Sequence, residues 1–321
     1  MKVAIIGCGL IGNKRAKALK GHEIVSACDT DIERAKSLCA AHGGANPTTD
    51  WKKSLSSGAD IAIVSTTNNL LTPISAQALK NGMHVLVEKP AARNFSEIKV
   101  IIDAAKDSSK IVKVGYNHRF HPAISKAHGM FAAGEIGEMM FLRARYGHGG
   151  RLGYEKEWRA NTEISGGGEL IDQGSHLIDL SCWFLGDITE VSGSIRTFFW
   201  DMKADDNAFV SLANKKGNIA WLHASSSEWK NLFCLEVYGK TGKLQIDGLG
   251  GSYGTEKLTY YKMLPQMGVP ETQVWEFPGT DLSWEYEFNA FVDAINNKTS
   301  QIAGLTDAGE NLKIVDKLYN R

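Results

Sequence analysis

The chain has 321 residues, a length typical of two globular domains. Its 36 Lys and Arg residues balance its 36 Asp and Glu residues, and this zero net charge argues against nucleic acid as the main partner. With 43% hydrophobic and 22% charged residues the composition is that of a globular protein, and no apolar run approaches the roughly 18 residues needed to cross a membrane.

The first third of the chain alternates apolar, strand-like runs with helix-like segments. The predicted strands are Val3–Ile6, Glu23–Cys28, Ile61–Val64, His84–Val87 and Ile111–Val114. The predicted helices are Leu10–Leu19, Asp31–Ala41, a segment containing Ile74–Leu79, and Phe95–Ala105. This alternation predicts an α/β fold, a doubly wound parallel sheet with helices on both faces, which we place at residues 1–121.

The pattern changes after His121, and residues 122–321 are predicted to form an α+β domain. Its predicted elements are a helix at Pro122–Phe131, a strand at Met139–Tyr146, a helix at Glu169–Phe184, successive strands from Thr189 to Phe277, and closing helices at Leu282–Ile295 and Asp307–Leu318. Hairpin signals occur at Asn214–Gly217 and Gly239–Gly242. Strands in succession, joined by hairpins, predict a large, mostly antiparallel open sheet.

A glycine-rich turn joins the first predicted strand to the first predicted helix. It reads Gly7-Cys8-Gly9-Leu10-Ile11-Gly12, the G-x-G-x-x-G spacing of dinucleotide-binding turns. The first glycine permits the tight turn, the second lets the backbone approach a pyrophosphate, and the third lets helix and strand pack closely. We therefore predict cofactor contacts from Gly7, Gly9, Leu10, Ile11 and Gly12; a glycine turn without ligand is the alternative.

Asp29 ends the second predicted strand and follows Gly12 by 17 residues, close to the spacing of about 20 expected for a ribose-binding acid. A carboxylate there accepts both ribose hydroxyls of NAD and repels the 2′-phosphate of NADP, so the sequence favours NAD. Arg34 nearby would weaken this preference. The alternative is that Asp29 caps the next helix, for which Asp31 is an equal candidate.

Two further segments follow strands at the edge of the sheet where ligands of such folds bind. Glu88-Lys89-Pro90 follows His84–Val87, and we assign Glu88 and Lys89 to the cofactor site, with Lys89 also reaching a substrate oxygen. Thr66 and Asn68, after Ile61–Val64, are predicted to line the cofactor. A surface lysine and an ordinary polar loop are the respective alternatives.

The segment after Gly166-Gly167-Gly168 carries an unusual polar stripe. At about 100° per residue, Asp172, His176, Asp179 and Trp183 fall within a sector about 60° wide on one helix face. Three interpretations remain open: His176 is a general acid/base assisted by Asp172, the pair ligates a metal, or His176 is a core histidine. No third and fourth metal ligand can be located, so no metal site is assigned.

The loop before the three glycines, His148 to Arg159, is rich in charge. Arg151, Tyr154 and Arg159 are candidate contacts to an anionic or nucleotide-bearing substrate. The alternative is a charged loop anchored by Trp158.

The five cysteines (Cys8, Cys28, Cys39, Cys182, Cys234) are scattered and contain no C-x-x-C pair. Their odd number and spacing argue against a disulfide framework or a zinc knuckle and predict the reducing cytoplasm. The apolar run after Lys2 ends in glycines instead of a small-residue cleavage site, so we do not expect a signal peptide.

As an ordered set, the glycine turn, Glu88-Lys89-Pro90 and Gly166-Gly167-Gly168…Asp172…His176…Asp179 resemble the Gfo/Idh/MocA family of nicotinamide-dependent sugar and inositol dehydrogenases. The segment Gly115-Tyr116-Asn117-His118-Arg119-Phe120-His121-Pro122 is also similar to that family's sequence at the end of the nucleotide domain. The resemblance covers nearly the whole chain. One departure is Thr66-Thr67-Asn68-Asn69-Leu70-Leu71, where many relatives have a Pro and a His.

The resemblance implies a Rossmann domain followed by an α+β domain whose open sheet forms the interface of a homodimer or homotetramer. It implies that Lys89, Asp172 and His176 surround the reacting carbon, with Lys89–Pro90 as a cis peptide bond. Asn117 would lie near the nicotinamide and Arg119 near the substrate. Similar loops to 148–159 occur in relatives that act on nucleotide-linked sugars.

These features together predict an NAD-dependent oxidoreductase that acts on a secondary alcohol of a sugar, nucleotide-linked sugar or cyclitol. In this hypothesis His176 removes the hydroxyl proton, Lys89 orients the oxygen, and Asp172 holds a neighbouring hydroxyl. A non-catalytic NAD(H)-binding sensor or scaffold of the same fold is the alternative from another class, and a metal-dependent dehydrogenase is a second enzymatic alternative.

Overall fold

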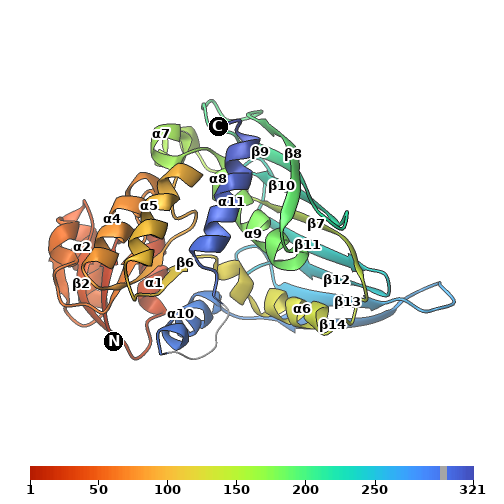
Figure 1. The fold of residues 1–321 in the computed structure, drawn as a ribbon, viewed down its shortest axis with the longest axis horizontal. Helices are drawn as coiled ribbons and strands as arrows, with labels where there is room; N and C mark the ends of the chain where they lie inside the picture. The colour runs from red at the N-terminus through yellow and green to blue at the C-terminus, as the bar shows by residue number, and fades with distance from the viewer. Residues whose placement is uncertain (297–301) are drawn as a thin grey trace. The chain divides into compact units, whose positions relative to one another are not determined.

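The structure is a computed structural model that describes residues 1–296 and 302–321. The chain forms two compact units (Figure 1). The first comprises Met1–Tyr116, Glu163–Gly166 and Trp284–Lys313, and the second comprises Asn117–Thr162, Gly167–Ser283 and Ile314–Arg321.

The first unit contains a six-stranded parallel sheet. Its strands are β1 (Lys2–Ile6), β2 (Glu23–Cys28), β3 (Asn46–Thr48), β4 (Ile61–Val64), β5 (His84–Val87) and β6 (Val112–Val114). They lie in the order β3-β2-β1-β4-β5-β6, and each neighbouring pair is parallel. The order reverses between β1 and β4, which is the switch point where ligands bind in sheets of this type. The predicted doubly wound fold is confirmed.

Helices accompany this sheet along the chain, and one comes from near the C-terminus. They are α1 (Leu10–Lys17), α2 (Ile32–Ala41), α3 (Trp51–Ser54), α4 (Asn68–Lys80), α5 (Phe95–Lys106) and α10 (Ser283–Ile295). Phe288 and Phe291 of α10 are buried in the same apolar cluster as Ile5 and Ile63. The core of this parallel sheet is therefore completed by residues from the C-terminal part of the chain.

The second unit contains a large open sheet. Its strands are β7 (Met139–Gly147), β8 (Ile188–Arg196), β9 (Asn207–Asn214), β10 (Ile219–Ser225), β11 (Leu232–Gly239), β12 (Gly242–Asp247), β13 (Glu256–Lys262) and β14 (Glu271–Phe277). They lie in the order β14-β13-β12-β11-β7-β10-β9-β8, with β7 and β10 as the parallel pair in an otherwise antiparallel sheet. The predicted open, mostly antiparallel sheet and both predicted hairpins are confirmed.

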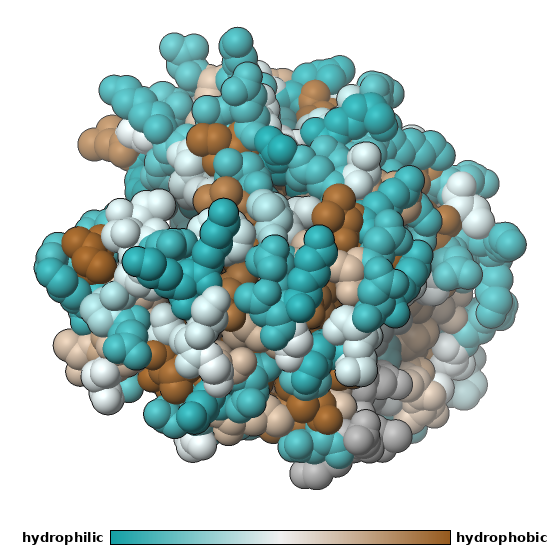
Figure 2. Space-filling model, turned by 60° about the vertical axis from the view of Figure 1, so that its left-hand side comes forward, coloured by the Kyte–Doolittle hydropathy of each residue, from teal (hydrophilic) through white to brown (hydrophobic). Residues whose placement is uncertain are grey.

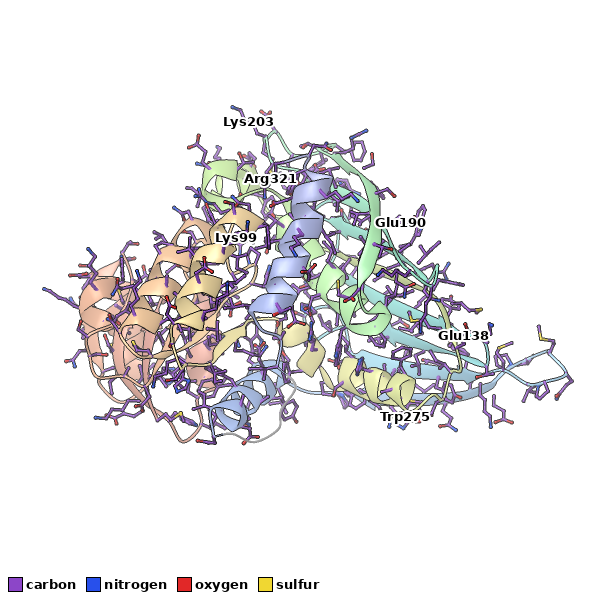
Figure 3. The ribbon with its side chains drawn as sticks, in the orientation of Figure 1. Lys99, Glu138, Glu190, Lys203, Trp275 and Arg321 are labelled. Carbon is purple, nitrogen blue, oxygen red and sulfur yellow. The ribbon has the colours of Figure 1, made fainter. Side chains whose placement is uncertain are left out.

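The remaining elements are helices and 3-10 turns. They are α6 (Pro122–Ala132), α7 (Thr162–Ser165), α8 (Glu169–Asp172), α9 (Gly174–Leu185), α11 (Leu305–Leu318) and the 3-10 turns Asn117–Phe120, Tyr154–Lys156 and Trp158–Ala160. Most of α7 and the part of α11 up to Lys313 belong to the first unit. Helix α9 contacts β7 and β10, and α6 contacts β12, β13 and β14. Lys126 of α6 lies 4.5 Å from the ring centre of Trp275 on β14, which is labelled in Figure 3.

The predicted single helix at 169–184 is interrupted. Helix α8 ends at Asp172 and α9 begins at Gly174, with Gln173 between them. The His176 amide donates to the carbonyl of Gln173, three residues back, instead of four, so the hydrogen-bond ladder tightens at this point. Asp172 and His176 therefore lie on either side of a break in the helix.

No helix within the described residues is long and apolar enough to span a membrane. Figure 2 shows a face on which hydrophilic side chains predominate and apolar residues are scattered, the usual pattern of a protein surface in water.

Candidate active site

The glycine turn has the geometry that a dinucleotide pyrophosphate requires. Gly7 has φ +99°, and a Cβ there would lie 2.3 Å from the carbonyl oxygen of Ser65. A Cβ on Gly12 would lie 1.9 Å from the carbonyl oxygen of Gly7, whereas a Cβ on Gly9 would meet nothing within 4 Å. The outer glycines are needed by the protein's own packing, and Gly9 leaves open space beside the turn.

Helix α1 begins directly after this open position. Its N-cap is Gly9, which offers no side-chain hydrogen bond to the first turn, and Leu10 is 77% exposed. The first N–H groups of the helix and its positive end are thus available to an anion. The turn fits the pyrophosphate of a dinucleotide, as the sequence predicts, and its contacts from Gly9, Leu10 and Ile11 stay a prediction.

Asp29 binds the glycine turn and does not cap α2. Its Oδ2 accepts a hydrogen bond from the Cys8 amide at 2.7 Å, and its Oδ1 accepts one from the Asp31 amide at 3.0 Å. The N-cap of α2 is Asp31, whose carboxylate accepts from the Glu33 amide. This arrangement holds the Asp29 carboxylate beside the turn, where a ribose-binding acid is needed. Arg34 lies 3.5 Å from Asp31 in an exposed ion pair.

The other predicted residues of the first unit form bonds within the protein. Asn68 begins α4, and its amide donates to the carbonyl of Ser165 at 2.7 Å. The Thr66 hydroxyl donates to the carbonyl of Thr67 at 3.2 Å. Glu88 is 8% exposed and accepts from Arg15 Nε at 2.6 Å. The predicted cis peptide bond at Lys89–Pro90 is confirmed.

In the second unit, Asp205 fixes the start of α8. Its carboxylate accepts from the amides of Gly168 and Leu170, both at 2.8 Å, and from the Tyr319 hydroxyl at 2.6 Å. A Cβ on Gly168 would lie 2.0 Å from the Asp205 carbonyl oxygen, so this position accepts only glycine. Gly168 is therefore needed for close packing. The carboxylate of Asp205, a residue that the sequence analysis did not single out, caps the N-terminus of α8.

Asp172 is paired with a residue of the preceding loop. Arg159 Nε donates to Asp172 Oδ2 at 2.8 Å, and the negative charge of Asp172 raises the pKa of Arg159. The two residues were assigned separately from sequence, Asp172 to catalysis and Arg159 to substrate binding. The structure brings them together, so that Arg159 fixes the orientation of the Asp172 carboxylate.

Tyr154, from the same loop, is buried beside α8. Its hydroxyl donates to Glu169 Oε1 at 2.6 Å, and burial raises the pKa of this tyrosine. Glu169 is 1% exposed. Arg151, in contrast, lies at the surface and pairs with Glu157 at 2.7 Å.

His176 forms a hydrogen bond with a second histidine. Its Nδ1 lies 2.6 Å from Nδ1 of His118, with ring centres 3.7 Å apart, and both residues are 5% exposed or less. Because Nδ1 is used in this bond, Nε2 is the nitrogen of His176 that can act on a substrate. His118 was not assigned a role from sequence; its only signal was its place in the Gly115–Pro122 segment.

The remaining predicted residues lie beside these groups. Arg119 donates twice to Asp179, at 2.8 and 2.6 Å, and lies over the ring of Trp183 at 5.4 Å. The Asn117 amide donates to the Ser283 hydroxyl at 2.8 Å. Of the polar stripe, His176 and Asp179 on α9 are thus hydrogen-bonded to the Asn117–Phe120 turn, whereas Asp172 on α8 is bonded to Arg159.

Two buried oxygen atoms beside Asp172 accept no hydrogen bond from the residues that the structure describes. They are Oε2 of Glu169 and Oε1 of Gln173, one helical turn apart. Buried acceptors are nearly always satisfied by protein, water or ligand. No group of three or more His, Cys, Asp or Glu in residues 1–296 and 302–321 is arranged to hold a metal ion.

Comparisons with known proteins agree with this geometry. Residues 1–116 match the model of an oxidoreductase family with an NAD-binding Rossmann fold, and residues 124–245 match the C-terminal domain model of the same family. The chain belongs to the Gfo/Idh/MocA family. Both family domains lie in the order that the sequence pattern predicts.

Individual members of the Gfo/Idh/MocA family are similar over much of the chain. A scyllo-inositol 2-dehydrogenase (NAD(+)) of Bacillus subtilis is 26% identical and aligns over 98% of this chain and 92% of that protein. Levoglucosan dehydrogenase of Pseudarthrobacter phenanthrenivorans is 26% identical over 68% of this chain, but the alignment spans only 59% of that protein. The solved structure of levoglucosan dehydrogenase with NADH and L-sorbose has a TM-score of 0.89 at 20% identity, and covers 100% of this chain and 96% of that one.

Proposed function

We propose that this protein is an NAD-dependent dehydrogenase that oxidises a secondary alcohol of a sugar, nucleotide-linked sugar or cyclitol, and reduces the ketone in the reverse direction. The observation that carries the proposal is the group around α8 and α9, where a buried His176, bonded to His118 through Nδ1, and an Asp172 carboxylate oriented by Arg159 lie on one short segment. The Asp172 carboxylate is 25% exposed, so a hydroxyl group of a polyhydroxylated substrate can reach it. The family relatives that act on inositol and levoglucosan support this substrate class.

In the proposed reaction, each residue of the candidate site has a separate role. Bound NAD supplies the hydride acceptor. His176 takes the hydroxyl proton at Nε2, and Lys89 orients the oxygen and stabilises its developing negative charge. Asp172, held by Arg159, accepts a hydrogen bond from a neighbouring hydroxyl. Arg119, Arg151 and Tyr154 remain candidates for substrate recognition.

The cofactor preference follows from Asp29. Its carboxylate is anchored beside the glycine turn by the Cys8 amide, in a position that disfavours a 2′-phosphate. We therefore propose NAD over NADP, with contacts from the glycine turn, Thr66, Asn68, Glu88, Lys89 and Asn117.

A substrate panel tests this function. Purified protein mixed with NAD or NADP and with sugars, inositols and nucleotide-linked sugars should produce reduced cofactor, measured by its absorbance, and faster with NAD. Tight NADH binding with no turnover on any compound would favour the sensor alternative. Activity that is unchanged after exhaustive chelation would remove the metal-dependent alternative.

We also propose that the protein is a homodimer or homotetramer joined through the open sheet. Trp221 of β10 is 64% exposed, Ile219 is 41% exposed, and Phe209 of β9 stacks on His223 with ring centres 4.3 Å apart. A row of exposed apolar side chains on a sheet is typical of an interface between subunits.

Replacing Trp221 with glutamate should convert the assembly to a monomer, because a buried charge without a partner is costly at an interface. The mass in solution, from light scattering, measures this. The control is Leu152→Glu, a change at a fully exposed loop residue outside the sheet. An unchanged mass for Trp221→Glu would contradict this interface.

The buried thiols Cys8, Cys28, Cys39 and Cys234 support a reducing compartment, which we propose is the cytoplasm. Burial raises the pKa of the Cys8 thiol to about 12, which makes it unreactive.

A further inference from the structure

We propose that His118 is a positioning residue for His176: it determines which nitrogen of His176 carries hydrogen, and it receives the substrate's proton through His176. This inference rests on the proposed function of His176 as the base. It assigns a role to a residue that touches the reacting group only through another side chain.

The distance between the two Nδ1 atoms requires a shared proton. At 2.6 Å, two N–H groups would clash and two lone pairs would repel, so one Nδ1 donates and the other accepts. The tautomers of the two rings are therefore coupled. When His176 donates through Nδ1, its Nε2 has a lone pair and is a base; when His118 donates, Nε2 of a neutral His176 carries hydrogen and is an acid.

Proton transfer along the pair balances the proposed oxidation. The alcohol O–H bond breaks and its proton binds Nε2 of His176, while the carbinol C–H bond delivers hydride to NAD. The Nδ1–H bond of His176 then breaks as a new N–H bond forms on Nδ1 of His118. His176 ends neutral, with hydrogen on Nε2, and the positive charge lies on His118; reduction of the ketone runs the same steps in reverse.

The surroundings of His118 hold it in place for this role. Its ring is 3% exposed and lies against Tyr146 of β7, at 5.0 Å, and Phe233 of β11, at 5.9 Å between ring centres. It belongs to the 3-10 turn Asn117–Phe120, whose Arg119 is bound to Asp179 of α9. The turn and helix α9 are thus joined by two contacts, His118 with His176 and Arg119 with Asp179, which together hold the His118 imidazole against the helix.

Several ionisable groups lie close to the pair. His121, with its ring centre 5.5 Å from that of His118, pairs with Glu256 at 2.9 Å and has Asp281 at 3.9 Å. The others are the Tyr146 hydroxyl, the Arg119–Asp179 pair, the Arg159–Asp172 pair and Glu169. Because the two histidines share one hydrogen bond, a pH profile reports on the pair and not on either ring alone.

The experiment compares two substitutions of His118. His118→Gln keeps a side chain that can form a hydrogen bond with His176 but cannot take up a proton, and His118→Phe fills the space without a hydrogen bond. We expect kcat to fall about 10-fold or more for the glutamine variant and further for the phenylalanine variant, with KM and NADH affinity within about twofold. Without its imidazole partner, His176 is a weaker base, so the acid limb of the kcat profile should move to lower pH in both variants.

His128→Gln is the matched control. His128 is a half-buried histidine of the same unit and stacks on Trp183 of α9, with ring centres 3.6 Å apart. It should leave both kcat and the pH profile unchanged. The inference is overturned if His118→Gln keeps kcat within twofold of the wild type and keeps the wild-type pH profile. It is also overturned if kcat, KM and NADH affinity all worsen together while the pH profile does not shift.

A measurement on the wild-type protein does not depend on the folding of any variant. With 15N incorporated at histidine, we expect NMR to detect a scalar coupling between the two Nδ1 nuclei across the hydrogen bond. Its absence in well-resolved spectra would overturn the shared proton.

The His176→Ala variant distinguishes failure of the proposed function from failure of the role of His118. If that variant keeps its turnover, the proposed function fails; if it loses turnover while the His118 variants do not, only the role of His118 fails.

Discussion

Replacing His176 with alanine should lower kcat by about 100-fold or more, the usual contribution of a positioned general base. The methyl group of alanine cannot accept the substrate's proton. NADH affinity should stay close to that of the wild type, because the glycine turn and Asp29 that we assign to the cofactor belong to the other unit of the chain. Steady-state kinetics together with a direct NADH titration separate the two quantities.

The control for this substitution is His128→Ala, which removes an imidazole of the same unit that has no assigned role. It should retain wild-type turnover. A His176→Ala enzyme with turnover within tenfold of the wild type would contradict the assignment of the base. Loss of NADH affinity in parallel with turnover would point to a damaged structure instead of a missing base.

The Rossmann-type half of the fold could be predicted well because its signals are local. Bounds for β2, β4 and β5 agree with the predicted strands at both ends, since each is a short, mainly apolar run followed by a polar residue. Strand β3 and helix α3 were not predicted: β3 has three residues and contains Pro47, which carries no strand signal. The parallel pairing of β7 with β10 also left no mark in the sequence, because register between distant strands depends on packing.

The residues of the candidate site were easier to predict than their partners. Spacing and residue type indicated Asp172 and His176, and motif position indicated Lys89. Their partners are far apart in the chain: His118 lies 58 residues from His176, and Asp205 lies 37 residues from Gly168. Single-sequence patterns report what is near along the chain, and side-chain pairs formed by folding have no fixed spacing to detect.

A buried ionic network in the first unit joins side chains that are distant in the sequence. Arg15 of α1, fully buried, donates to Glu88 after β5 and to Glu287 of α10, and Lys113 lies 2.9 Å from Glu287. Burial raises the pKa of Glu88; it also opposes ionisation of Glu287, but Arg15 and Lys113 hold the pKa of that carboxyl below its usual value. Two cations are thus matched to two carboxylates in the interior, and one of these carboxylates, Glu88, directly precedes Lys89.

Replacing Glu287 with alanine should reduce the free energy of unfolding by about 3–5 kcal/mol, because it leaves the charges of Arg15 and Lys113 buried with one carboxylate between them. Urea unfolding measures the change. The matched control is Glu285→Ala on the same helix, since Glu285 forms an ion pair with the largely exposed Lys20 and should cost no more than about 1 kcal/mol. Equal losses for the two variants would contradict a structural role for the network.

Because this network includes Glu287 of α10, we expect residues 1–116 to be unstable as a separate fragment. Residues 1–116 match the family's Rossmann model as a continuous segment, but Glu287, which accepts from Arg15, lies 272 residues further along. Phe288 and Phe291 of the same helix fill the core beside Ile5 and Ile63. A fragment that ends at Tyr116 therefore exposes part of its core and buries Arg15 and Lys113 against Glu88 alone. It should unfold at a lower urea concentration than even the Glu287→Ala protein, and a fragment as stable as the full chain would show that α10 is dispensable to this unit.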